Sequence, residues 1–194
     1  SSGGADPWDV NRYMNIWLGN LGGGLLGYAE FPPISSTYGL VVHYCTVNGS
    51  CPPFNLNRTM THEVGHNFTL LHIWGDDGGA CTGSDQVSDT PNQADATSGC
   101  YTFPKTDACA TTSPGIMFMN YQDYSNDNCL NMHSDGQKTR ARSAITSYLM
   151  SLANNDSVCA PAAGVDAGIS AIVSPGGLLC NSAFTPVVTL RNFG

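Results

Sequence analysis

Hydrophobic residues gather in three short stretches early in the chain, and glycine and proline break the pattern between them. The stretches are YMNIWLGN at residues 13–20, LLGYAEFPP at 25–33 and GLVVHYCTV at 39–47. Short runs rich in aliphatic and aromatic residues and bounded by Gly and Pro are typical of strands. The pattern therefore predicts three short strands that form a sheet.

A helical spacing follows, in which apolar residues recur every three or four positions. Met60, Val64, Phe68 and Leu71 fall on one stripe of a helix at about 100° per residue. This spacing predicts a helix over about residues 58–70, with its apolar stripe on the core.

A second helix is predicted at residues 134–154, SDGQKTRARSAITSYLMSLAN. Ser134 is placed as its N-cap, and Gln137, three residues on, completes a capping box. Residues 73–134 are irregular, with four cysteines and many Gly, Asp, Asn, Ser and Thr residues. Loops of this length are uncommon unless they are functional or cross-linked. We therefore expect this loop to be functional, cross-linked or both.

The composition changes after Cys159. A linker rich in Pro, Ala and Gly is followed by alternating Val, Ile and Leu. This alternation predicts the first strands of a truncated β-sandwich module of the Ig-like kind. We therefore expect two domains, residues 1–158 and residues 159–194.

Charge limits the classes of partner. The 194 residues contain 7 Lys and Arg against 15 Asp and Glu, which gives a net charge of −8. Nucleic-acid binding is driven by clustered cations, so this balance argues against it and favours basic partners. No apolar run approaches the roughly 18 residues of a membrane span, and the first residues lack the features of a signal peptide. We expect no membrane span, and a signal segment that was removed earlier or never present.

Eight cysteines in a chain with little charge indicate an oxidising compartment, which makes a secreted protein the expectation. Eight cysteines allow 105 pairings, so the connectivity does not follow from their number. Proximity places one pair, Cys45 with Cys51, across the tight turn TVNGS.

The stretch THEVGHNFTLLHIWG, residues 61–75, contains the strongest candidate site. On a helix, His62 and His66 lie one turn apart, so both can bind one ion at about 2.0–2.1 Å, with Glu63 free to act on a water. His72 would lie about 240° round a continued helix from His66, so the chain must leave the helix just after Phe68 for it to join them. Three neutral imidazoles leave a fourth zinc position open, as catalysis requires. The alternative is a chance string in an ordinary helix.

Over about residues 1–155 the chain resembles the pappalysin-type branch of the metzincin metallopeptidases. The segments that carry the resemblance are HEVGHNFTLLH, DPWDVNRYMNIWLGNL, LLGYAEFP, CTGSDQVSDTP, NYQDYSNDNC and GQKTRAR. The resemblance implies an α+β fold: a mixed sheet with an active-site helix, a loop-rich disulfide-linked C-terminal subdomain and a C-terminal helix. Catalytic domains of this family begin with more sheet and helix upstream, so that missing part is an expected partner.

The resemblance also implies an activity, zinc-dependent cleavage of proteins or peptides. It makes Glu63 the group that takes a proton from water, and it places Tyr124 near the metal, where it steadies the oxyanion; the alternative for Tyr124 is a packing role. We interpret His43 and His133 as structural. The strand at 39–47 is expected to form the rim of the cleft, where a peptide substrate adds as a further strand.

Two residues depart from the family pattern. Thr69 stands where the family usually has Gly, and because a β-branched residue tolerates a positive φ poorly, we expect the turn to differ in shape. Gln122 aligns with the methionine that lies under the zinc of metzincins. Met119 is an alternative for that methionine, but Tyr124 and Cys129 hold the register against it. A polar replacement there is expected to perturb the site more than abolish it.

The resemblance implies three further features. Cys81 pairs with Cys109, Cys100 with Cys129, and Cys159 with Cys180. Calcium is held by Asp85, the Val87 carbonyl and Thr90, for which hard oxygen ligands are suited; the alternative is a plain Asx-rich turn. Asp127 selects Arg, or Lys, after the scissile bond, unless it merely caps a turn.

A different class of function is a zinc-binding adhesion or scaffold module that has lost turnover. Thr69, Gln122 and the appended sandwich favour that hypothesis. The intact Glu63 argues against it, because a lapsed enzyme does not need its general base.

Overall fold

The computed structural model describes residues 4–154, 167–174 and 187–192. The chain divides into two compact units, residues 1–154 and 155–194. The predicted domain boundary after residue 158 lies outside the described residues. So does the implied pair Cys159–Cys180.

The first unit contains a mixed three-stranded sheet, as predicted. Its strands are β1 (Asn15–Gly19), β2 (Gly27–Ala29) and β3 (Gly39–His43), in the order β1-β3-β2. β1 pairs with β3 in parallel, and β2 pairs with β3 antiparallel. β3 is therefore the central strand, and the prediction that it forms the cleft rim is wrong. Both β1 and β2 lie at edges of this sheet, and of these two β2 is the edge strand that contacts α2.

The end of the third predicted strand is a short helix, α1 (Tyr44–Val47), and not a strand. His43 caps this helix, since its Nδ1 accepts the Cys45 N–H at 3.2 Å. The Cys45–Cys51 disulfide then closes the turn. These local bonds outweigh the strand preference of the stretch, and they give His43 the structural role that the sequence indicated.

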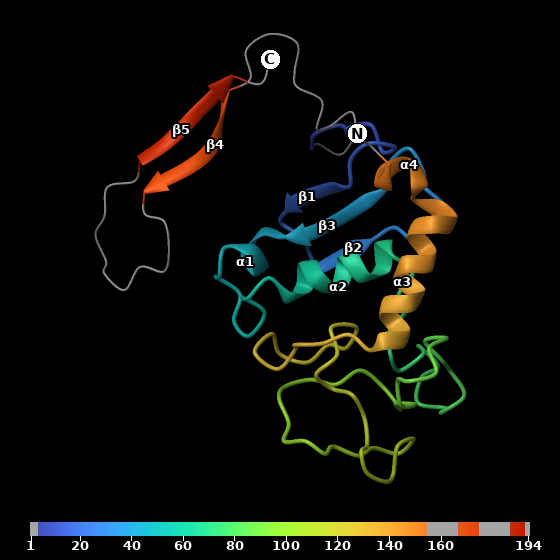
Figure 1. Ribbon diagram of the computed structural model, residues 1–194. Helices are drawn as coiled ribbons and strands as arrows, with labels where there is room; N and C mark the ends of the chain where they lie inside the picture. Colours follow the sequence, from blue (N-terminus) through green and yellow to red (C-terminus); the bar gives the residue numbers. More distant parts are fainter. Residues whose placement is uncertain (1–3, 155–166, 175–186, 193–194) are drawn as a thin grey trace. The chain divides into compact units, whose positions relative to one another are not determined.

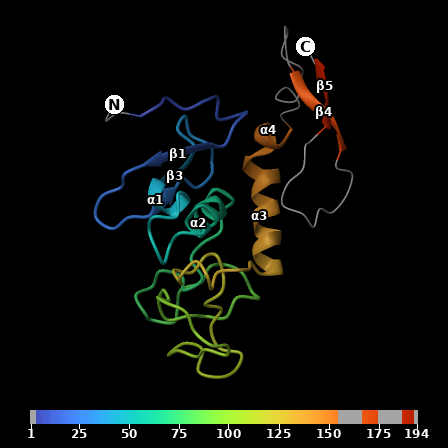
Figure 2. The ribbon, with the colours of Figure 1, turned by 90° about the vertical axis from the view of Figure 1, so that its left-hand side faces the viewer.

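Helix α2 (Arg58–Asn67) lies between the sheet and the irregular residues that follow the helix in the chain (Figures 1 and 2). Its last residue fastens it to the sheet. Asn67 Nδ2 donates to the carbonyls of Glu30 (2.7 Å) and Gly39 (3.0 Å), and the buried Tyr38 hydroxyl donates to the Asn67 carbonyl (2.5 Å). The C-terminal end of α2 therefore has a fixed position beside β2 and β3.

The most buried face of α2 is polar. The predicted apolar stripe is half-buried, whereas the buried positions are His62, Glu63, Gly65, His66 and Asn67. The prediction placed the core on the wrong stripe, because it left out the irregular residues that cover the histidine face.

Helix α3 (Asp135–Tyr148) and a short α4 (Met150–Ala153) replace the single predicted second helix, with Leu149 between them. The capping box is confirmed. Ser134 Oγ accepts the Gln137 N–H at 3.0 Å, and the Gln137 Oε1 accepts the Ser134 N–H at 2.9 Å. Ser134 also donates to Asp89 at 2.7 Å, which attaches α3 to the preceding loop.

Residues 68–134, which we call the irregular segment, contain no helix or strand among the elements that the structure describes. The segment is cross-linked within itself by Cys81–Cys109 and Cys100–Cys129, the pairs that the resemblance implies. In the second unit, β4 (Ala167–Ser174) pairs antiparallel with β5 (Val187–Asn192). This pair is compatible with the start of a β-sandwich, which stays a prediction.

Candidate metal centre and cleft

The end of α2 determines where the third histidine lies. The Thr69 N–H donates to the His66 carbonyl (2.9 Å), and the Leu70 N–H donates to the Gly65 carbonyl (2.9 Å). These bonds form a Schellman motif, whose left-handed residue is usually Gly. The chain therefore leaves the helix after Phe68, as predicted.

The left-handed residue of this motif is Thr69, with φ 68°. The expectation that threonine would reshape the turn is wrong, because Thr69 takes the conformation at a cost of about 1–2 kcal/mol. The turn is also held from outside, since Arg140 Nε on α3 donates to the Thr69 carbonyl at 2.8 Å.

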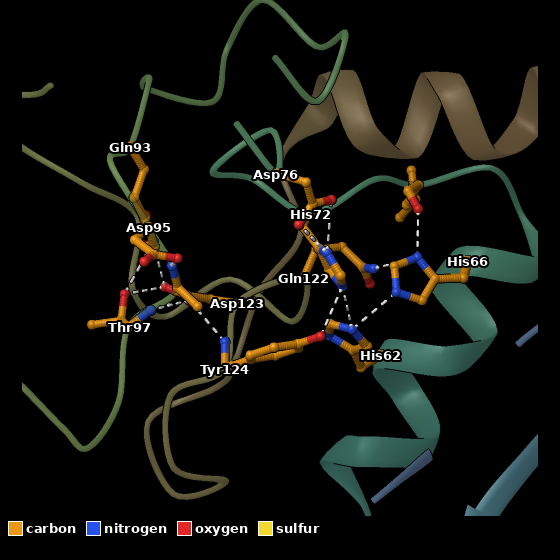
Figure 3. Close-up of polar contacts among 12 residues, drawn as sticks. His62, His66, His72, Asp76, Gln93, Asp95, Thr97, Gln122, Asp123 and Tyr124 are labelled. Atoms are coloured by element: carbon orange, nitrogen blue, oxygen red, sulfur yellow. Dashed lines mark hydrogen bonds and ion pairs between the residues drawn. The ribbon is translucent and has the colours of Figure 1, made fainter. Parts of the chain in front are cut away.

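The three predicted ligands come together at one point (Figure 3). The Nε2 atom of His62 lies 3.0 Å from that of His66 and 3.3 Å from that of His72. A tetrahedral zinc with bonds of about 2.0–2.1 Å would hold neighbouring nitrogens about 3.3 Å apart. The spacing of the rings therefore fits one zinc ion.

The other nitrogen of each ring faces an acceptor. The Nδ1 atoms lie 2.8 Å from the Tyr121 carbonyl for His62, 2.7 Å from the Leu70 carbonyl for His66, and 2.9 Å from the Asp76 carboxylate for His72. A carbonyl or carboxylate oxygen only accepts, so each Nδ1 carries the hydrogen. Three Nε2 lone pairs then converge on one point, an arrangement that a cation stabilises. The donor set fits zinc.

Burial keeps two of these rings neutral. It lowers the pKa of His62 from 6.5 to about 3 and that of His66 to about 4. Metal ligands must be deprotonated, so both rings are ready to bind near neutral pH.

Glu63 lies at the base of the cleft beside β2. Its side chain is buried, and burial raises its pKa from 4.5 to about 7. Gly27 makes room for it, because a Cβ at residue 27 would approach the Glu63 Oε1 to 2.7 Å. A carboxyl group with a pKa near neutrality can both take and give a proton.

Tyr124 faces the histidines from the irregular segment. Its hydroxyl lies 3.3 Å from the His72 Nε2, and 49% of the residue is exposed. The packing alternative fits this exposure poorly. The Tyr124 hydroxyl therefore lies beside the candidate ligands, where the resemblance expects it.

Gln122 is fully buried beside His66, with its Nε2 placed 3.5 Å from the His66 Nδ1. Gly65 permits this approach, since a Cβ there would collide with the Gln122 amide. Gln122 lies in the turn at residues 120–123, where the Asp123 N–H donates to the Asn120 carbonyl (3.0 Å). Its Oε1 is 3.4 Å from the His133 Nε2, so His133 packs behind the site.

A cavity of about 320 Å³ lies next to Glu63. Its lining includes Leu25, Phe54, Tyr124, Asp127 and Leu130. Asp127 is buried, and its Oδ2 accepts the N–H groups of Leu56 (2.7 Å) and Arg58 (3.3 Å). Asp127 therefore both anchors the chain that enters α2 and borders the cavity.

The three residues predicted to hold calcium also lie close together. Thr90 Oγ1 lies 2.8 Å from each Asp85 carboxylate oxygen and 3.0 Å from the Val87 carbonyl. The Val87 N–H donates to Asp85 at 3.1 Å, which is the Asx turn of the alternative interpretation. Both features occur in the same turn, so its hydrogen bonds do not exclude either.

Asp123, which no motif in the sequence indicated, organises the irregular segment behind Tyr124 (Figure 3). This buried carboxylate accepts the Thr97 N–H (2.8 Å), the Thr97 hydroxyl, the Gln93 Nε2 (3.1 Å) and the Tyr124 N–H (2.7 Å). Burial raises the pKa of Asp123. Its only signal in the sequence was its place next to Tyr124.

Comparisons with known proteins agree with this geometry. The profile of the M43 peptidases, described as pregnancy-associated plasma protein-A, matches residues 4–146. An extracellular metalloprotease of Podospora anserina is 42% identical over 144 residues, which cover 70% of this chain and 47% of the relative. One of Pyricularia oryzae is 38% identical over 148 residues, 72% of this chain and 49% of the relative.

The solved structure of Tannerella forsythia mature mirolysin with a cleaved peptide is similar as well. It shows 49% identity and a TM-score of 0.74, over 77% of this chain and 59% of that one. The chain spans about half the length of the curated relatives it matches. Within the described residues, no helix is long and apolar enough to cross a membrane.

The fold and the histidine cluster define a metzincin-like α+β metallopeptidase domain. Within that class, the chain belongs to the M43, or pappalysin, family of peptidases.

Proposed function

We propose that this chain is the catalytic part of a zinc-dependent endopeptidase that hydrolyses peptide bonds with a water activated by Glu63. One observation carries the proposal: three imidazole rings, each with Nδ1 beside an acceptor oxygen, direct their Nε2 atoms at one point beside a buried carboxyl group. The ligands are His62, His66 and His72.

Zinc, when bound, polarises the scissile carbonyl and lowers the pKa of a water to about 7. Glu63 takes the proton of the attacking water and delivers it to the leaving amine. A pKa raised to about 7 by burial suits both transfers. Tyr124 donates its hydroxyl hydrogen to the substrate oxygen that becomes negative, which stabilises the transition state.

The substrate is a protein or peptide that adds to the edge of β2 as a further strand. Within residues 4–154, β2 pairs with β3 alone, so its other edge is open to a partner. Leu25, Leu26 and Gly27 lie at or before the start of this strand and line the cavity beside Glu63. A peptide on β2 would therefore cross the catalytic groups.

The side chain after the scissile bond enters the cavity, where Asp127 selects Arg or Lys. Its hydrogen bonds to the protein use Oδ2, so Oδ1 remains for a guanidinium or ammonium group. Charge-assisted bonds of this kind are about twice as strong as neutral ones. The net charge of −8 favours the same substrates by long-range attraction.

A structural calcium ion held by Asp85, the Val87 carbonyl and Thr90 is part of the proposal, supported by the convergence of their oxygens. We also infer secretion, because the relatives are extracellular metalloproteases and the first unit contains three disulfides. As the resemblance implies, an upstream part of the catalytic domain is a proposed partner.

The test is cleavage of a denatured protein by the purified chain, with and without a zinc chelator. We expect cleavage that the chelator stops and added zinc restores. Glu63→Ala should bind zinc but not cleave. A chain that binds zinc and leaves every substrate intact, like its Glu63→Ala variant, would instead be the lapsed binding module.

A further inference from the structure

The three candidate ligands are held by different kinds of partner. Backbone carbonyls hold His62 and His66, which lie on α2 and are buried. His72 lies in the irregular segment, with 18% of its side chain exposed, and its partner is the carboxylate of Asp76. Both oxygens of that carboxylate reach the Nδ1, at 2.9 and 3.0 Å. Of the three, His72 is the ligand whose orientation depends on a charged side chain.

The backbone after His72 is shaped to bring this carboxylate back to the ring. Gly75 and Asp76 have φ values of 71° and 52°, in the left-handed region. Gly75 has no room for a side chain, because a Cβ would collide with the backbone of Gly83 and Ser84. Asp is one of the few residues that take this conformation readily. Two consecutive residues with positive φ thus follow Trp74 directly.

The indole of Trp74 covers one face of the His72 ring. The two rings are stacked with centroids 4.2 Å apart and an angle of 9° between their planes. Stacking fixes the plane of the imidazole but leaves the ring free to flip by ~180° about its Cβ–Cγ bond. The hydrogen bond from Nδ1 to Asp76 removes this freedom and directs Nε2 at the other two ligands (Figure 3).

The neighbouring Asp77 has a different role. Its carboxylate accepts the N–H groups of Gly79, Ala80, Thr82 and Gly83, at 2.6–3.1 Å, and so folds the loop that follows. The two aspartates therefore differ in their hydrogen bonds to the described residues. Asp77 accepts backbone N–H groups, whereas Asp76 accepts the hydrogen of the His72 ring.

We propose that Asp76 is a positioning residue for zinc: it orients His72, fixes its Nδ1–H tautomer and increases its strength as a donor. The inference rests on the proposed zinc site. Removing such a partner of a ligand commonly weakens metal binding 10–100-fold. An ordinary surface ion pair, by contrast, would leave metal affinity unchanged.

The test compares Asp76→Asn and Asp76→Gly with the parent chain. Both replacements tolerate a positive φ, so neither introduces backbone strain. Asn keeps an acceptor oxygen without the charge, and Gly removes the side chain. The control is Asp135→Asn, which removes a charge whose side chain is 93% exposed. For each chain we would measure the zinc Kd by chelator competition and the thermal midpoint of the zinc-free protein.

We expect the zinc Kd to rise about 10-fold in Asp76→Asn and towards 100-fold in Asp76→Gly. The control should match the parent, and all zinc-free midpoints should agree. Cobalt in place of zinc should show a shifted visible spectrum in both Asp76 variants. Equal zinc affinity in all four chains would overturn the inference and leave the proposed function intact. A fall in the zinc-free midpoint that accounts for the weaker binding would also overturn it. A parent chain that binds no zinc would contradict the proposed function itself.

Discussion

Helix α2 and the irregular segment contribute to the same site, but they are ordered by different interactions. The helix places His62, Glu63 and His66 by its period, and its backbone hydrogen bonds are local. The segment supplies His72, Tyr124 and Asp127 without regular structure. Within the segment, carboxylates accept backbone N–H groups that a helix or sheet would otherwise pair with carbonyls.

Three aspartates of the segment illustrate this. Asp77 and Asp123 bind backbone N–H groups, as described, and Asp107 accepts those of Ala94, Cys109 and Ala110 at 2.7–2.8 Å. Each carboxylate satisfies several donors that a helix or sheet would otherwise pair. With two disulfides, these bonds help to order a stretch that has no helix or strand among its described residues. Catalysis that uses groups from both regions therefore depends on the backbone hydrogen bonds of the helix and on the carboxylate bonds and disulfides of the segment.

The largest expected effect is that of Tyr124→Phe, which changes the segment and leaves the helix unchanged. It removes one hydroxyl from the segment and leaves every group of the helix in place. Loss of one donor to an oxyanion commonly lowers kcat by about 10²–10³. We expect that loss at full zinc content, measured by steady-state cleavage of a peptide. An unchanged kcat would assign Tyr124 to packing.

Calcium removal should weaken the segment while the helix stays intact. With calcium at about 100 times its Kd, binding adds ~2.7 kcal/mol to stability, or roughly 5 °C or more in thermal midpoint. A calcium-selective chelator should remove this gain, and Asp85→Ala should be insensitive to it. If the thermal midpoint of the parent chain is the same with and without calcium, the turn at residues 85–90 is a plain Asx turn.

Asp127→Asn tests whether the segment determines specificity. Asn retains an oxygen for the N–H groups of Leu56 and Arg58, so the entry to α2 should be preserved. We expect kcat/KM for peptides with Arg after the cut bond to fall about 10–100-fold, because a hydrogen bond to a charged group contributes ~1.5–3 kcal/mol. Profiling of cleavage sites measures this, with Asp135→Asn as the matched charge control. A parent preference for large apolar residues would refute the assignment.

The smallest effect is expected at the junction of the two regions. Thr69→Gly should raise the free energy of unfolding by about 1 kcal/mol, because glycine takes a φ of 68° without strain. Thr69→Ala should gain less, since alanine also resists this conformation. Urea unfolding measures both variants. A destabilised Thr69→Gly would mean that the threonine makes a contact more valuable than its strain.

The same division explains what the sequence could predict. The positions of His62, Glu63 and His66 follow from a period of about 3.6 residues, and the capping box at Ser134 is a local pattern. The contacts of Asp123 with Gln93 and Thr97 join residues 30 and 26 positions apart with no period to indicate them. Strand order was missed for a similar reason, because a short apolar run between Gly and Pro identifies a strand but not its neighbours. The role of Asp76 depends on two left-handed residues that no spacing reveals.

Anomalous scattering at the zinc edge, measured on crystals of the zinc-loaded chain, tests the central claim that helix and segment share one metal. The account predicts a single peak in residues 4–154, at about 2.0–2.1 Å from the Nε2 atoms of His62, His66 and His72. A peak bound by the two helical histidines without His72 would contradict it, because the segment would then have no part in holding the metal.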